Sequence, residues 1–357
     1  MSHRWSVLLL ILLAALAGPV QAQPAPRSEV PIQAVRLSNG ALRYAVPIRI
    51  GSVDLLASLD TGSTGLRILP WVLGPADARV SVDPEVYGYA SGSRYEGVVG
   101  EATVVMGAAR GTAPVHLIGA IGCFAYLPRC PASRAPIMRY GIASDGLPGE
   151  GFKAILGIDM APGRVGNPFR SLGVRRWIVV LPRPGEGEGR LILNPSDAET
   201  EGYAMAPLAA PYAHERGGGL HDAVPGCLAN TATHARACGV VLLDTGGAGL
   251  AVANSALGGE PWPNGTPASL ELFDASGGLA ARESLTIGER DHGTRLSFRR
   301  ESRVFGVVIY AGVSPYLAYS VLYDTRRQMI GLKARPPAAE GPRATPVAPA
   351  PGVGLEN

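Results

Sequence analysis

The sequence has few charged residues, few aromatic residues and no dense block of Lys and Arg. Of its 357 residues, 17% are charged and 6% are aromatic, and the formal net charge is +3. Proteins that bind nucleic acid usually carry a basic patch or stripe that neutralises phosphates. We therefore expect no nucleic-acid partner.

Long apolar runs are missing beyond the N-terminus. Arg4 precedes a short apolar run, 7–17, and Val20-Gln21-Ala22 offers the small residues that signal peptidase requires. This pattern predicts an export signal over residues 1–22 and a mature protein in the periplasm or outside the cell, although an uncleaved anchor is the alternative. No other stretch approaches the roughly 18 apolar residues of a membrane helix, so we expect no membrane contact after cleavage.

Only four cysteines are present, and an exported chain with four cysteines is expected to form two disulfides. Three connectivities are possible. The local one, Cys123 with Cys130 and Cys227 with Cys238, closes the shortest loops and is favoured. His234 lies near Cys238, but no second Cys or His pair supports a zinc site, and we expect no metal ion.

Glycine and proline are abundant instead, with 47 and 31 residues, as is typical of short strands joined by turns. The mature chain is longer than one hydrophobic core usually supports, so two lobes are expected. We predict a flexible leader over 23–29, an N-terminal lobe over 30–182, a C-terminal lobe over 183–335 and a disordered Pro/Ala-rich tail over 336–357. Predicted strands include 45–50, 55–59, 102–106, 177–181, 190–193, 240–243 and 320–323, with a helix near 168–172 capped by Asn167 and a glycine-rich hairpin turn over 184–189.

One tetrapeptide occurs twice, about half the mature chain apart. Leu59-Asp60-Thr61-Gly62 recurs as Leu243-Asp244-Thr245-Gly246, each time after apolar strand residues. A half-chain repeat with one acid per copy predicts two similar lobes that meet at those acids. A single Asp-Thr-Gly would indicate no more than a structural turn.

Two facing Asp-Thr-Gly turns would provide acid and base chemistry. Two carboxyls in contact cannot both ionise cheaply, so one holds a proton and the other does not. A water between them can then be deprotonated as it attacks a carbonyl, while the protonated partner donates to the developing oxyanion. Thr61 and Thr245 would hold the turns, Gly62 and Gly246 would let the backbones approach, and no cofactor is required.

These motifs resemble the pepsin family of aspartic peptidases. Asp60-Thr61-Gly62-Ser63 resembles the family's first motif and Asp244-Thr245-Gly246 its second. The segments 154–157 and 312–332 resemble those that pass behind the catalytic turns, and 167–181 resembles the crossing between lobes. The first motif and Gly65-Leu66-Arg67 are also similar to a set of exported bacterial proteins.

The resemblance implies an all-β, bilobal pepsin-like fold of two β-barrel-like lobes with a cleft between them. The activity that it implies is hydrolysis of a peptide bound in an extended conformation in the cleft, with Asp60 and Asp244 as the catalytic pair. The resemblance also implies that the protein is a monomer. Tyr89-Ala90-Ser91-Gly92 resembles the flap hairpin, whose tyrosine closes over substrate. Tyr95 is the competing flap tyrosine, and either tyrosine could instead be an ordinary half-buried strand residue.

The sequence departs from the family pattern at two places. Gly247 stands where the family usually has Ser or Thr, whose hydroxyl supports the catalytic Asp; we therefore expect a pH optimum nearer neutral than pepsin's. Gly65-Leu66-Arg67 stands where the aromatic partner of the flap tyrosine is usual, which predicts a differently positioned flap.

Two other classes of protein remain as alternatives. A pepsin-fold protein that binds or inhibits without turnover is the main one, but both acids and both Asp-Thr-Gly turns are kept, which favours catalysis. A Ser/His/Asp hydrolase has little support, because the Gly-x-Ser-x-Gly motif is absent.

Overall fold

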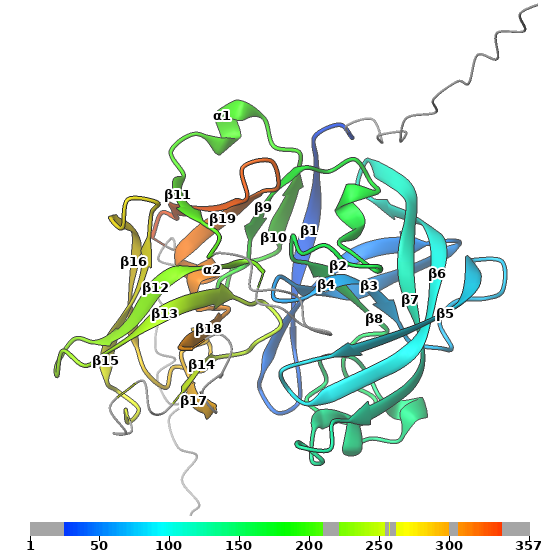
Figure 1. Cartoon of the computed structure of the whole chain (residues 1–357), viewed down its shortest axis with the longest axis horizontal. Coiled ribbons are helices and arrows are strands. Elements are labelled where there is room, and N and C mark those ends of the chain that lie inside the picture. Colours follow the sequence, from blue (N-terminus) through cyan, green and yellow to red (C-terminus); the bar gives the residue numbers. More distant parts are fainter. Residues whose placement is uncertain (1–24, 210–220, 254–256, 258–261, 300–305, 338–357) are drawn as a thin grey trace, which may run out of the picture.

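The computed structural model describes residues 25–209, 221–253, 257, 262–299 and 306–337, and it is mostly β (Figure 1). Strands account for 51% of the residues and helices for 7%, which confirms the all-β prediction. The export signal predicted over 1–22 and the tail beyond Pro337 lie outside the described residues. No helix in the described ranges is both long and apolar enough to cross a membrane.

The strands of the first part of the chain are β1 (Ser28–Arg36), β2 (Leu42–Ile50), β3 (Val53–Asp60), β4 (Thr64–Ile68), β5 (Ala78–Gly88), β6 (Ser93–Met106), β7 (Ala109–Cys123), β8 (Ala154–Ile158), β9 (Arg176–Val180) and β10 (Gly189–Leu193). Those that follow are β11 (Ala204–Pro207), β12 (Ala223–Asn230), β13 (Arg236–Leu243), β14 (Leu250–Ala253), β15 (Pro267–Phe273), β16 (Leu279–Thr286), β17 (Leu296–Arg299), β18 (Val308–Gly312), β19 (Tyr319–Asp324) and β20 (Met329–Ala334). The helical segments are short: α1 (Asp197–Thr200), α2 (Ser314–Ala318) and the 3-10 turns η1 (Pro131–Ser133), η2 (Ile137–Arg139) and η3 (Pro168–Arg170).

One strand arrangement occurs in both halves of the chain. In the first half, β3 pairs antiparallel with β2 and parallel with β8, which pairs antiparallel with β4; β4 then pairs parallel with β7. In the second half, β13, β12, β18, β14 and β17 repeat this order with the same orientations. The two sets lie on opposite sides in Figure 1, the first at the right and the second at the left. The tetrapeptide repeat is therefore part of a larger structural repeat.

Six antiparallel strands connect the two halves, in the order β11, β20, β19, β9, β10 and β1. The hairpin β9–β10 comes from the first half and β19–β20 from the second, and Val179 of one pairs with Val321 of the other. The indole of Trp177 stacks on the ring of Tyr323 with centroids 5.4 Å apart, and both side chains are fully buried. The expected lobe boundary at 182/183 lies in the turn between β9 and β10, which pair with each other.

Most local predictions from the sequence are confirmed, and one is wrong. Every predicted strand overlaps an observed strand, and the Asn167 side chain caps a helical turn, although this turn is the 3-10 turn η3. Both disulfides have the local connectivity. The flexible leader predicted over 23–29 is too long, because β1 begins at Ser28, which pairs with Leu193. That partner is remote in sequence, so no local pattern could reveal it.

Candidate functional site

The structure brings together the two acids that the sequence repeat singled out. Asp60 is the last residue of β3 and Asp244 follows β13 directly, so equivalent strands deliver both to the junction of the halves. A Cβ atom at Gly62 would lie 2.6 Å from the carboxyl carbon of Asp244, and one at Gly246 would lie 2.9 Å from that of Asp60. Each turn therefore approaches the opposite acid so closely that only glycine fits.

Thr61 and Thr245 join the two turns by reciprocal hydrogen bonds. The Thr61 amide donates to Thr245 Oγ1 at 3.1 Å, and the Thr245 amide donates to Thr61 Oγ1 at 2.9 Å. Each hydroxyl also donates to a carbonyl of the opposite strand, Thr61 to Leu243 and Thr245 to Leu59. Four buried bonds thus fix the two acids relative to each other, as the sequence predicted for these threonines.

The Asp60 carboxyl is buried but well supplied with donors. The Ser63 hydroxyl donates to its Oδ2 at 2.7 Å and the Gly62 amide to its Oδ1 at 2.9 Å. Burial raises the pKa of Asp60, while Ser63, Gly62 and the Asp244 side chain each offset part of that rise. The two carboxyls are neighbours, because a Cβ atom at Gly246 would lie 2.9 Å from Asp60 Oδ1 and 3.1 Å from Asp244 Oδ1.

Asp244 is only half-buried, and its turn differs at one position. Its Oδ1 accepts from the Gly246 amide at 2.9 Å, as Asp60 does from Gly62. Gly247 occupies the position equivalent to Ser63 and has no hydroxyl to donate. A Cβ atom there would lie 3.2 Å from Asp244 Oδ2.

A glycine passes behind each turn, as expected for 154–157 and for Gly312. Gly157 of β8 pairs with Asp60 in register, and a Cβ there would lie within 3 Å of the backbone of Ser63 and Thr64. Gly312, with φ of 59°, would bring a Cβ to 2.5 Å from the Gly249 carbonyl oxygen. Both contacts are too close for any other residue, so these glycines allow the neighbouring backbone to pack directly against the turns.

The hairpin β5–β6 provides the predicted flap residues. Its turn holds Tyr89, Ser91 and Gly92, and Gly92 has φ of 90°, a value that favours glycine. The Tyr89 hydroxyl is buried and has no hydrogen-bond partner among the described residues. Tyr95, on β6, packs its ring against that of Tyr89 with centroids 5.1 Å apart, in a small apolar cluster where its hydroxyl contacts that of Tyr140 at 2.7 Å.

Two residues that sequence reasoning did not assign to the site connect this hairpin to the first turn. The Thr64 amide donates to the Tyr87 hydroxyl at 3.5 Å, and the buried Arg67 guanidinium lies 3.3 Å above the Tyr87 ring. Arg67 also donates to the carbonyls of Thr64 and Gly65. In the sequence, Gly65-Leu66-Arg67 stands where the resemblance leads us to expect an aromatic residue, but nothing there indicated that Arg67 packs on a tyrosine two residues before Tyr89.

Both acids line a cavity of about 370 Å³, together with Tyr87, Tyr89 and Ser91. The remaining walls include aromatic side chains, Tyr95, Phe124, Tyr126, Tyr140 and Tyr310, and the ion pair of Arg43 with Asp145. This lining offers apolar surface, hydroxyl groups, the carboxyls of Asp60 and Asp244, and a third carboxyl, Asp145, that is paired with Arg43. A chain with hydrogen-bonding backbone and mixed side chains would fit such a surface.

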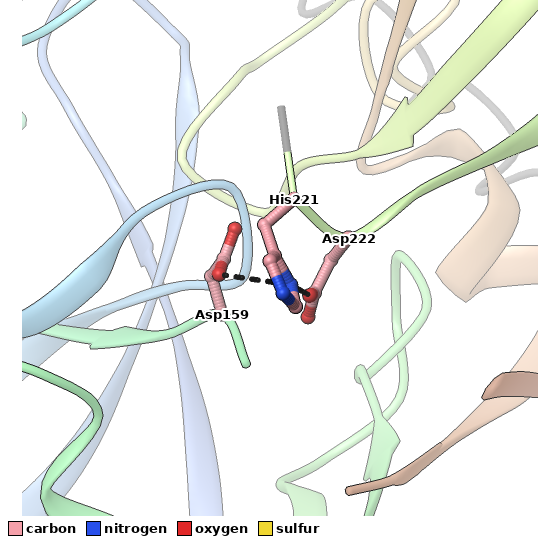
Figure 2. Close-up of side chains that lie close together, drawn as sticks. All are labelled: Asp159, His221 and Asp222. Atoms are coloured by element: carbon pink, nitrogen blue, oxygen red, sulfur yellow. Dashed lines mark hydrogen bonds and ion pairs between the residues drawn. The ribbon is translucent and has the colours of Figure 1, made fainter. Parts of the chain in front are cut away.

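A second acidic group lies behind the first turn, outside the cavity. Asp159, His221 and Asp222 are buried, and the three side chains present ligand atoms within 4.8 Å of one another (Figure 2). Burial raises the pKa of Asp222 to about 8; burial and repulsion from Asp222 raise the pKa of Asp159 well above its usual range. In the described part of the chain this is the group that could hold a metal ion, and no sequence motif pointed to it.

No family model matches the chain, and no curated protein matches its sequence.

Proposed function

We propose that this protein is an exported aspartic endopeptidase with a bilobal, pepsin-like fold. The observation that carries the proposal is the placement of Asp60 and Asp244 side by side on two equivalent turns, at the wall of a cavity that the β5–β6 hairpin also lines. The repeated strand arrangement supports the fold, because two equivalent halves deliver one acid each.

The chemistry follows from the enclosure of the pair. Burial disfavours the charged form of Asp60, so the two carboxyls together keep a proton at pH values where exposed aspartates are ionised. The ionised carboxyl takes a proton from a water molecule while the oxygen of that water attacks the peptide carbonyl carbon. At the same time the protonated carboxyl donates its proton to the carbonyl oxygen. Proton transfer to the amide nitrogen then breaks the C–N bond and gives an acid and an amine.

The substrate is an extended peptide held between the acids and the hairpin. Strand edges and hairpins bind extended peptides through main-chain hydrogen bonds. Tyr89 and Ser91 line the cavity from the hairpin, and the buried Tyr89 hydroxyl is a candidate donor to such a peptide. No metal ion or cofactor takes part in the proposed step.

A matched set of variants tests this proposal. Wild type, Asp60→Asn, Asp244→Asn and Asp54→Asn would be assayed between pH 3 and 8 on a peptide library, with and without a statine-type inhibitor. Asp54 is an exposed carboxylate paired with Arg49, so its variant controls for the loss of one charge. Cleavage should disappear in the two dyad variants and with the inhibitor, and persist in Asp54→Asn.

The alternative is a pepsin-fold protein that binds or inhibits without turnover. Gly247 favours this alternative, because it leaves Asp244 without the neighbouring hydroxyl that is usual in the family. Peptide binding by wild type without cleavage at any pH would establish that alternative, and cleavage retained in Asp60→Asn would exclude the proposed mechanism.

A further inference from the structure

The cluster of Asp159, His221 and Asp222 joins the two halves of the protein. Asp159 follows β8 of the first half, and His221 and Asp222 lead into β12 of the second. Figure 2 shows the imidazole between the two carboxyls, with His221 Nδ1 2.7 Å from Asp222 Oδ1 and 3.9 Å from Asp159 Oδ1. The Met160 amide also donates across the junction, to Asp222 Oδ2 at 2.9 Å.

The same cluster contacts the turn that carries Asp60. The Asp159 amide donates to the Ser63 carbonyl at 2.9 Å, and the Thr64 hydroxyl donates to the Asp159 carbonyl at 3.3 Å. Ser63 in turn donates its hydroxyl to the Asp60 carboxylate. A short chain of hydrogen bonds therefore leads from Asp222 through the 159–160 backbone to the acid in the cavity.

The side chains of the cluster do not reach the cavity itself. Of the described residues that line it, none is Asp159, His221 or Asp222. All three side chains are at least nine-tenths buried. Any effect of the cluster on a bound peptide must therefore pass through the Asp60 turn.

We propose that Asp159, His221 and Asp222 form a lock between the halves that positions the Asp60 turn from behind. Apolar packing could hold the halves together without fixing their orientation, because it is not directional. The hydrogen bond from the Met160 amide to Asp222 is directional, so it fixes the orientation of the segment behind Ser63 relative to the second half. The raised pKa values of both carboxyls indicate that burying them is costly, which fits a positioning role better than a stabilising one.

The kinetic consequence rests on the proposed peptidase function, but the structural one does not. Asp222→Leu removes the acceptor of the Met160 amide and one partner of His221. We expect kcat to fall by roughly 10- to 100-fold with little change in KM, because small displacements of a reacting group have effects of this order. Amide hydrogen exchange over residues 59–66 should become faster in the same variant.

Two further variants separate positioning from general destabilisation. Asp222→Asn keeps an oxygen that can accept from Met160, so it should recover most of the kcat and most of the exchange protection. Glu271→Leu removes another buried carboxylate, which is paired with Arg236 and Arg282 on β13 and β16. It should lower the melting temperature but leave kcat and the exchange of 59–66 unchanged.

The outcomes are distinguishable. Unchanged exchange over 59–66 in Asp222→Leu would overturn the lock, whether or not the protein cleaves peptides. If wild type has no activity but the exchange responds as expected, the lock stands and the peptidase proposal fails. A third outcome is that wild type binds one zinc ion, that Asp222→Leu abolishes this binding, and that removing the zinc with a chelator speeds amide exchange over 59–66. That outcome would overturn the lock and show that the cluster is a metal centre instead.

Discussion

Tyr316 of the second half donates its hydroxyl to Thr61 Oγ1 of the first half at 2.8 Å. The same hydroxyl lies 3.2 Å from the Leu243 carbonyl oxygen and 2.5 Å from the hydroxyl of Tyr323. Tyr316 and Tyr323 are fully buried. The reciprocal hydrogen bonds of the two threonines are therefore not symmetric, because among the described residues Thr61 accepts this additional hydrogen bond and Thr245 does not.

This asymmetry predicts that Thr61→Val costs more stability than Thr245→Val. Each variant leaves a buried amide without its partner and removes a hydroxyl donor from a buried carbonyl, and Thr61→Val also removes an acceptor of Tyr316. We expect losses of about 2–4 kcal/mol in the free energy of unfolding, with Thr61→Val the larger, since each unmade buried hydrogen bond costs about 1–3 kcal/mol. Urea denaturation measures the difference, and Thr61→Ser and Thr245→Ser, which keep the hydroxyls, should lose much less. Equal losses in the two valine variants would contradict a role for Tyr316.

The hydroxyl beside one acid and its absence beside the other predict opposite shifts in the pH–rate profile. Ser63→Ala removes a donor to Asp60, which destabilises the charged carboxylate and raises its pKa further. The acidic limb of kcat/KM should then move to higher pH. Gly247→Ser places a hydroxyl near Asp244 Oδ2 and should move that limb to lower pH. A profile that stays in place in both variants would mean that these hydroxyls do not control the proton shared by the pair.

The acids of this site could be predicted from the sequence, whereas the groups around them could not. Asp60 and Asp244 lie in identical tetrapeptides, and each tetrapeptide encodes its own turn locally. Asp159 and Asp222 lie in no repeated motif, and only the packing of the halves brings them together. The contact of Arg67 with Tyr87 has the same origin, because it depends on how the β5–β6 hairpin folds over β4.

A buried carboxyl that does not line the cavity predicts how stability depends on pH. Burial raises the pKa of Glu283 to about 7, from an ordinary value of 4.5, although the Ser314 hydroxyl donates to it. The folded state therefore keeps a proton that the unfolded chain has lost, so this contribution is complete below about pH 4.5 and is lost as pH rises through 7. Glu283→Gln should consequently gain stability relative to wild type between pH 5 and 8, as measured by thermal unfolding. A constant difference across that range would show that Glu283 does not titrate there.

The disulfide between Cys123 and Cys130 closes a loop that packs against the β5–β6 hairpin turn. The Phe124 amide donates to the Gly92 carbonyl at 2.9 Å, and a Cβ at Gly92 would lie 2.7 Å from Leu127 Cβ and 3.1 Å from Cys130 Cβ. The turn that holds Tyr89 is thus held in place by a loop that the disulfide keeps compact.

Removing that disulfide should loosen the hairpin, whereas removing the other should not. The two bridges close loops of similar length, with sequence separations of 7 and 11, so chain entropy predicts similar losses of about 2–3 kcal/mol for each. The double variant Cys123→Ala/Cys130→Ala should nevertheless show faster amide exchange over 88–93 and a raised KM for peptides. The matched pair, Cys227→Ala/Cys238→Ala, removes a bridge between β12 and β13 and should leave both quantities unchanged. If both double variants loosened 88–93 equally, the effect would reflect lost stability, and the loop closed by Cys123 and Cys130 would have no specific role in holding the hairpin.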